Sequence, residues 1–159
     1  MKMNNLSFAA IAAAWVLVSG IASGQSFPGG GGSSGSSATP NQRYRTVGIT
    51  IDGGGSAPSA GVKGYFQVPF SGTIVSATLI SNASGSCVVD VWKSNAAVPT
   101  ISNTITASDL PTLSSAQYEQ DTTLTGWTTT VSANDVFGFN LNSASTLTRV
   151  TLELTIEAN

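Results

Sequence analysis

The sequence predicts an all-β fold, an antiparallel β-sandwich of the jelly-roll type with seven or eight strands. From Arg43 onward, apolar residues recur at every second position between turn clusters that are spaced about ten residues apart. The same region is rich in Thr, Ser, Gly, Val and Asn, and β-branched residues pack well on a pleated surface. Strands with one apolar face each must cover one another, which favours two packed layers.

The clearest strand is 46–51, in which Val47, Ile49 and Ile51 share one face. Further strands are expected at 62–68, 73–81, 86–93, 122–131, 135–141 and 146–157, with a turn at 82–85. Residues 94–121 have a less regular apolar pattern. Pro99 and Pro111 argue against a long helix there. In that stretch we expect a short strand near 100–105 and a helical turn near 114–118.

Residues 1–24 have the pattern of a secretory signal helix: Lys2, the apolar run 8–18 and a small-residue exit. The run is shorter than the roughly 20 residues of a membrane span, so we expect cleavage after Ala22 or Gly24 and no stable span afterwards. The Gly/Ser-rich stretch 25–42 is expected to be a flexible linker. The predicted domain is 43–159.

Composition excludes several functions. The chain has 6 basic and 8 acidic residues, a net charge of −2, so no basic surface for nucleic acid is expected. It has no histidine and one cysteine, Cys87, which excludes a Ser-His pair and His/Cys zinc sites. Carboxylates remain, and Asp109, Glu119 and Asp121 fall in the irregular region. Scattered surface acids explain them more simply than a glycosidase pair does.

We therefore expect no enzyme, no cofactor and no metal. The acidic, Gly-rich turn at 52–55 lacks the dense ladder of oxygen ligands that a calcium loop has, and it indicates a tight turn with positive φ. Cys87 lies in an apolar strand and is expected to be a small buried hydrophobe.

Aromatic side chains offer a binding surface. Trp92 is predicted on the strand face opposite Cys87, Trp127 lies among threonines, and Tyr118 lies in the irregular region. Exposed aromatic rings stack on the apolar faces of sugars, so these three residues are candidate binding residues for a cell-surface glycan. Packing in the core or at an edge is the alternative for both tryptophans.

Several blocks of the chain, in order, resemble a β-sandwich domain that recurs in tail-fibre-like and other virion-associated proteins of bacteriophages and in uncharacterised bacterial secreted proteins. These are Thr-Val-Gly-Ile-Thr-Ile-Asp-Gly-Gly-Gly (46–55), Gly-Val-Lys-Gly-Tyr (61–65), Val-Pro-Phe-Ser-Gly-Thr-Ile (68–74), Gly-Ser-Cys-Val-Val-Asp-Val-Trp-Lys (85–93), Leu-Pro-Thr-Leu-Ser-Ser (110–115), Asp-Thr-Thr-Leu-Thr-Gly-Trp-Thr-Thr (121–129) and Thr-Arg-Val-Thr-Leu (148–152). The resemblance spans about 46–156 and implies a structural or host-contact role without catalytic residues. The apparent signal segment departs from it, since virion proteins assembled in the cytoplasm need none.

Two functional hypotheses follow. The first is a structural or adhesion protein, secreted or virion-associated, that self-associates. In it Thr46, Val47, Ile49 and Ile51, directly after the linker, pair with the open edge of a neighbouring subunit. The second is a secreted carbohydrate-binding module that uses Trp92, Trp127 and Tyr118.

Overall fold

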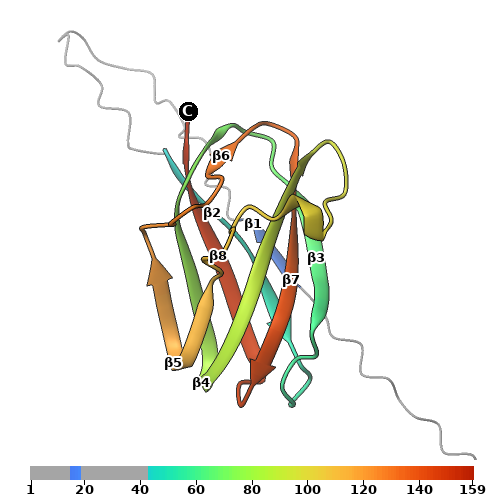
Figure 1. The fold of residues 1–159 in the computed structure, drawn as a ribbon, viewed down its shortest axis with the longest axis vertical. Helices are drawn as coiled ribbons and strands as arrows, with labels where there is room; N and C mark the ends of the chain where they lie inside the picture. Colours follow the sequence, from blue (N-terminus) through green and yellow to red (C-terminus); the bar gives the residue numbers. More distant parts are fainter. Residues whose placement is uncertain (1–14, 19–42) are drawn as a thin grey trace, which may run out of the picture.

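The computed structural model describes residues 15–18 and 43–159, and they form an all-β antiparallel sandwich, as predicted (Figure 1). The strands are β1 (Trp15–Val18), β2 (Tyr44–Asp52), β3 (Gly61–Gln67), β4 (Gly72–Asn95), β5 (Thr112–Asp121), β6 (Thr130–Val131), β7 (Asp135–Ser145) and β8 (Arg149–Ala158). One short 3-10 helix, η1 (Ile101–Asn103), lies between β4 and β5. No helix in the described ranges is long and apolar enough to cross a membrane.

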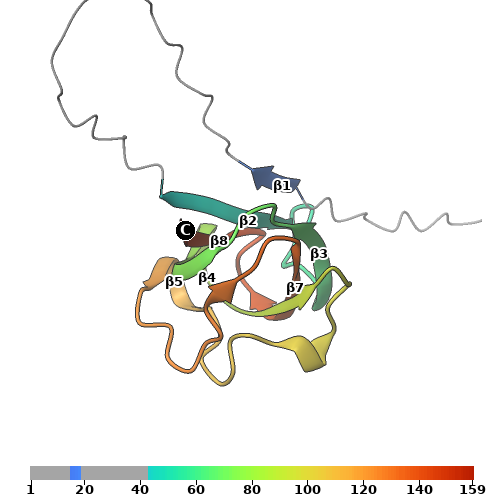
Figure 2. The ribbon, with the colours of Figure 1, turned by 90° about the horizontal axis from the view of Figure 1, so that it is seen from above.

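All strands belong to one hydrogen-bonded sheet that folds back on itself. Its order is β1-β2-β8-β4-β7-β3, and β5 and β6 also pair with β4. The first half of β4 pairs with β8 and the second half with β7. The sheet therefore has a β8 layer (β1, β2, β8, the first half of β4) and a β7 layer (the second half of β4, β7, β3), seen from above in Figure 2. β5 pairs with both halves of β4 and so borders both layers.

The corner between the layers lies where the sequence predicted a turn. The chain does reverse direction there, as predicted, but without leaving the sheet: β4 is continuous from Gly72 to Asn95, and its two halves run in opposite directions, one in each layer (Figure 1). Its polar residues hold the nearby β7–β8 connection: the Asn82 side chain donates to Thr148 Oγ1 (2.8 Å) and accepts from the Arg149 backbone N–H (2.9 Å). A Cβ at Gly85 would lie 2.7 Å from the Ser145 carbonyl oxygen, so the bend requires glycine there.

Three further predictions, between residues 100 and 131, were wrong or incomplete. Residues 114–118 are part of strand β5, where a helical turn was expected. The expected strand 122–131 is a loop except for β6. In place of a strand near 100–105, the chain forms η1 and then one isolated bridge between Thr104 and Trp92.

The core lies between the two layers and is drawn from residues 47–158. Val47, Ile49 and Ile51 of β2 are buried, as their alternation predicted. On the opposite layer, the Phe66 ring stacks on those of Phe137 and Phe139, with centroids 5.4 and 5.3 Å apart. All the described core residues thus lie within 47–158, and we expect the sandwich to fold without the segment before Arg43.

The predicted signal segment and linker fall mostly outside the described residues. Of residues 1–24 the structure describes only Trp15–Val18, which is extended as β1, and the linker 25–42 lies outside. Cys87 is buried in the core, as predicted, and this burial raises the pKa of its thiol.

Leu152→Ala should reduce the free energy of unfolding by about 2–5 kcal/mol, because Leu152 is fully buried between Ile49 and Leu79 and truncation leaves a cavity. Urea unfolding of residues 25–159 measures this change. Val98→Ala, at a side chain that is 66% exposed, is the matched control and should change stability by less than about 0.5 kcal/mol. Equal losses in the two variants would contradict the placement of the core.

Candidate functional site

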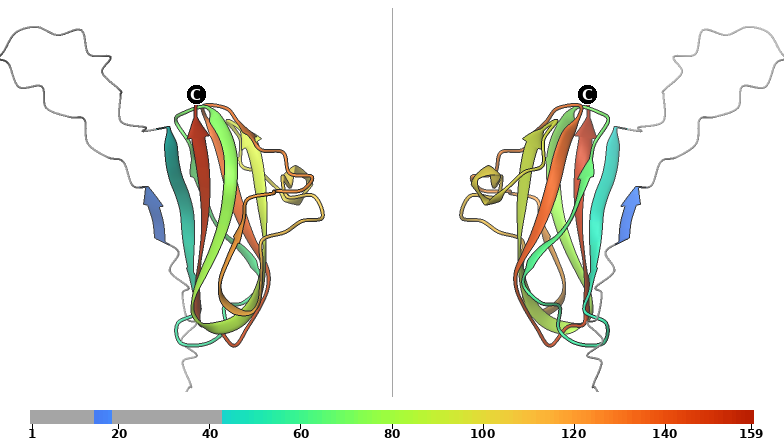
Figure 3. Two further views of the ribbon diagram at one scale, coloured as in Figure 1. Left: turned by 90° about the vertical axis from the view of Figure 1, so that its left-hand side faces the viewer. Right: turned by 90° about the vertical axis from the view of Figure 1, so that its right-hand side faces the viewer.

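The edge of the β8 layer is the most distinctive surface of the domain. β2 pairs with β8 at nine consecutive positions, from Tyr44–Glu157 to Asp52–Arg149, without a register shift. The other side of β2, called the β2 edge below, pairs antiparallel with β1, with Trp15 opposite Thr50 and Val18 opposite Val47 (Figure 3). The β2 edge therefore accepts an extended apolar segment as an additional strand.

This arrangement changes the predicted role of the assembly strand. Thr46, Val47, Ile49 and Ile51 do not form a free arm, because β2 is a full member of its own sheet and its apolar residues fill its own core. Exchanging β2 would expose that core. What the strand offers to another chain is its outer backbone edge.

The β2 edge lacks two of the features that usually protect edge strands from pairing, proline and bulges, and its one charge on the core side, Arg45, lies near one end of the strand over the Phe70 ring. Its central residues 46–51 carry no charge, and β2 has no proline and no bulge. The opposite layer differs, since β3 has an irregular register between Val62 and Gly64 and carries Lys63 there. Strand β5 has two register shifts along its pairing with β4. β2 is thus the most regular edge in the described part of the chain.

Charged residues lie at the two ends of β2. The Arg43 guanidinium is 2.7 Å from Glu157 at one end, and Arg149 is 2.7 Å from Asp52 at the other. The backbone N–H of Gly54 and the Arg149 side chain lower the pKa of Asp52. The same carboxylate holds the Gly-rich turn, where Gly54 and Gly55 have φ of +66° and +95°, which confirms a turn with positive φ.

Trp92 points outward from the β7 layer, yet it is only 6% exposed. Its indole N–H donates to Asp90 (2.6 Å), and the hydroxyls of Thr104 and Thr106 donate to the same carboxylate (2.6 and 2.8 Å). Asp90 is itself buried, and these three bonds provide the partners that a buried charge requires. The cluster fastens the loop around η1 onto the outer face of β4.

The other two predicted ligand-binding residues differ in exposure. Trp127 is 8% exposed, and its indole N–H donates to the Asp109 carbonyl (2.7 Å). Tyr118 on β5 is 59% exposed and lies opposite the partly exposed Ile80 of β4. Trp92 and Trp127 are therefore packing residues, and of the three predicted binding residues only Tyr118 presents its ring to solvent. The structure does not bring the three together into one platform.

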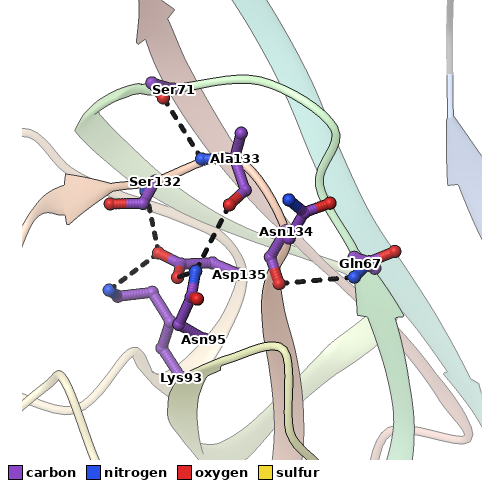
Figure 4. A network of polar contacts seen from close by, with 8 residues as sticks. All are labelled: Gln67, Ser71, Lys93, Asn95, Ser132, Ala133, Asn134 and Asp135. Carbon is purple, nitrogen blue, oxygen red and sulfur yellow. Dashed lines mark hydrogen bonds and ion pairs between the residues drawn. The ribbon is translucent and has the colours of Figure 1, made fainter.

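A second polar cluster closes the end of the sandwich where β4 finishes and β7 begins (Figure 4). Its centre is the buried Asp135 carboxylate, which accepts from Lys93 Nζ (2.9 Å), Asn95 Nδ2 (3.0 Å) and the Ser132 backbone N–H (2.8 Å). Burial alone would raise the pKa of Asp135, but these donors outweigh it and lower the pKa. The sequence analysis missed both Asp90 and Asp135, although a carboxylate within an apolar strand run is a signal for such a cluster.

The acids of the irregular region have structural roles. Asp121 accepts from the backbone N–H groups of Thr123 and Leu124, and Asp109 accepts from that of Thr125. Burial, followed by repulsion from Asp121 and Asp109, raises the pKa of Glu119. Within 15–18 and 43–159, no three His, Cys, Asp or Glu side chains gather in a group that could hold a metal ion.

Comparison with known proteins found no match among family models, curated proteins or solved structures. The resemblance to virion-associated domains therefore stays a prediction. The site assignments rest on the geometry of this chain alone.

Asp90→Asn should lower the free energy of unfolding by about 1–3 kcal/mol, because a neutral amide cannot accept from all three donors as a carboxylate does. It should also speed proteolysis within residues 96–111, which limited digestion measures. Glu153→Gln, on the outer face of β8, serves as the control and should change neither property. An unaltered digestion pattern in Asp90→Asn would count against the fastening role.

The free energy of unfolding of the domain should fall at acidic pH, because Asp135 becomes protonated. Its pKa is lowered on folding, so its stabilising contribution is complete above the unfolded-state value of about 3.8 and is lost as pH falls through the folded-state pKa. Asp135→Asn should therefore be less stable than wild type near neutral pH, and the difference should shrink below about pH 4. Thermal unfolding from pH 2 to 7 measures both curves, and a difference that does not change with pH would contradict the assignment.

Proposed function

We propose that this protein is a non-enzymatic structural or adhesion module that works outside the cytoplasm and assembles with other chains by strand addition at the β2 edge. One observation carries the proposal: the β2 edge holds an extended segment, β1, in antiparallel register. Main-chain hydrogen bonds supply affinity in strand addition and need no particular side chains. An unprotected edge of nine residues suits this mode of binding.

Export and assembly are linked in this proposal. Trp15–Val18 lies within the predicted signal segment, so cleavage after Ala22 or Gly24 removes β1 from the mature protein. The β2 edge then loses its strand and becomes free to bind another. The Gly/Ser-rich linker would let the mature domain extend away from a partner that is attached at its N-terminal side.

The chemistry of the described residues supports a role without catalysis. The buried carboxylates Asp90 and Asp135 are occupied by donors that fasten loops, and Asp109 and Asp121 accept from loop backbone. Such satisfied groups stabilise a scaffold and do not provide a free acid or base. A fibre-tip-like subunit, as the resemblance implies, needs no more than this.

Contact with a cell surface extends the same proposal. Tyr118 is the residue of the predicted glycan-binding set that remains exposed, and its ring can stack on the apolar face of a sugar. The burial of Trp92 and Trp127 leaves glycan binding with less support than assembly has.

Removal of β1 should increase self-association. Residues 25–159 are expected to form concentration-dependent oligomers, whereas the full chain, with β1 on its edge, should associate more weakly. Sedimentation velocity over a concentration series measures both, and mass spectrometry of material exported by a bacterial host locates the new N-terminus. A form of 25–159 that stays monomeric up to about 1 mM would overturn the proposal.

A further inference from the structure

We infer that the partner at the β2 edge is the β2 strand of a second copy, which pairs with it in antiparallel direction. The two-fold axis lies between Gly48 and the Gly48 of the second copy, and is called the axis through Gly48 below. This inference rests on the proposed function and adds the partner and its register. Joining two β2 strands in this way would merge the two β8 layers into one continuous sheet.

The sequence of β2 is symmetric about Gly48. Residues 46–50 are Thr-Val-Gly-Ile-Thr, which has the same residue types in both directions: hydroxyl, branched apolar, glycine, branched apolar, hydroxyl. A two-fold contact brings one surface against itself and therefore requires such self-complementarity. A strand that binds an unrelated partner has no such requirement.

Sheet geometry limits the register. Residues directly opposite each other in antiparallel strands point to the same face, so the two-fold axis must lie between one residue and its own counterpart in the second copy. An axis through Gly48 pairs all of Tyr44–Asp52 with its counterpart, whereas an axis through Val47 or Ile49 leaves part of the strand unpaired. The Gly48 axis also places Val47 opposite Ile49 on the core side and Thr46 opposite Thr50 on the outer side.

The ends of the strand are complementary in charge. In this register Asp52 lies opposite Tyr44 of the second copy, next to Arg43, whereas Arg45 points to the other face, over the Phe70 ring. The pairing therefore brings an acidic end against a basic end twice, once on each side of the axis. The same register covers residues 47–50, which β1 occupies, so β1 and a second copy compete for the edge.

Two double variants of residues 25–159 test the register, since all the described core residues lie within 47–158. Thr46→Lys with Thr50→Lys places lysine directly opposite lysine at both symmetric positions. It should raise the dissociation constant of the dimer about tenfold or more. Thr46→Lys with Thr50→Glu places lysine opposite glutamate instead, and dimerisation should be retained. Both threonines are partly buried on the outer face, and circular dichroism with thermal unfolding verifies that each variant folds.

Sedimentation velocity at low and high salt separates the outcomes. Dimers in wild type and in the Lys/Glu variant, with dissociation in the Lys/Lys variant that salt relieves, support the inference. Dissociation of both variants overturns the register while leaving the β2 edge as the assembly site. Dimers in all three overturn the inference and place assembly on another surface, and a monomeric wild type overturns the proposed function itself.

Discussion

The continuity of β4 is the constraint on which the rest of the structure depends. This 24-residue strand takes part in both layers, and β5, β6, β7 and β8 all pair with it. Because its first half fixes the register of β8 and its second half that of β7, the two layers cannot shift independently. The alternating core residues of both layers are thereby held in line, and the position of β2 follows from that of β8.

The polar clusters around Asp90 and Asp135 hold segments that the apolar faces of the strands do not hold. Asp90 fastens the loop around η1 to the outer face of β4, and Asp135 joins the end of β4 to the start of β7. Each buried carboxylate has several donors, so the cost of desolvating its charge is offset locally. The irregular part of the chain is thus tied to the sheet at positions where no alternation of side chains could hold it.

Much of the fold could be predicted from alternation, and the failures have identifiable causes. β2, β7 and β8 were predicted because each buries the apolar residues of one face and leaves the other face partly or fully exposed. The reversal at the Asn-Ala-Ser-Gly segment 82–85 was predicted, but not that the chain stays paired through it, so that two expected strands form the single strand β4. β5 was missed because its outer residues are polar and its pairing is irregular.

The candidate site was less accessible to prediction. The importance of β2 could be recognised from its alternation, but its partner β8 lies about a hundred residues away, and the pairing with β8 is what makes β2 a full member of its own sheet rather than a free arm. The direction in which Trp92 points was predicted correctly, whereas the loop that covers it carries no periodic signal. Burial by a distant loop is a tertiary property, and the local pattern of a strand does not encode it.

The antiparallel pairing of β2 with β8 also has a mechanical consequence. The linker enters at Arg43, and Arg43 and Ala158 are joined by a backbone hydrogen bond, so both termini of the domain lie at the same end. Tension between the linker and a contact at the opposite end runs along β2 and is shared by all of its ladder bonds at once. Tension between the two termini would open the same ladder one bond at a time. The domain should therefore resist tension between its Arg43 end and its opposite end better than tension between its two termini.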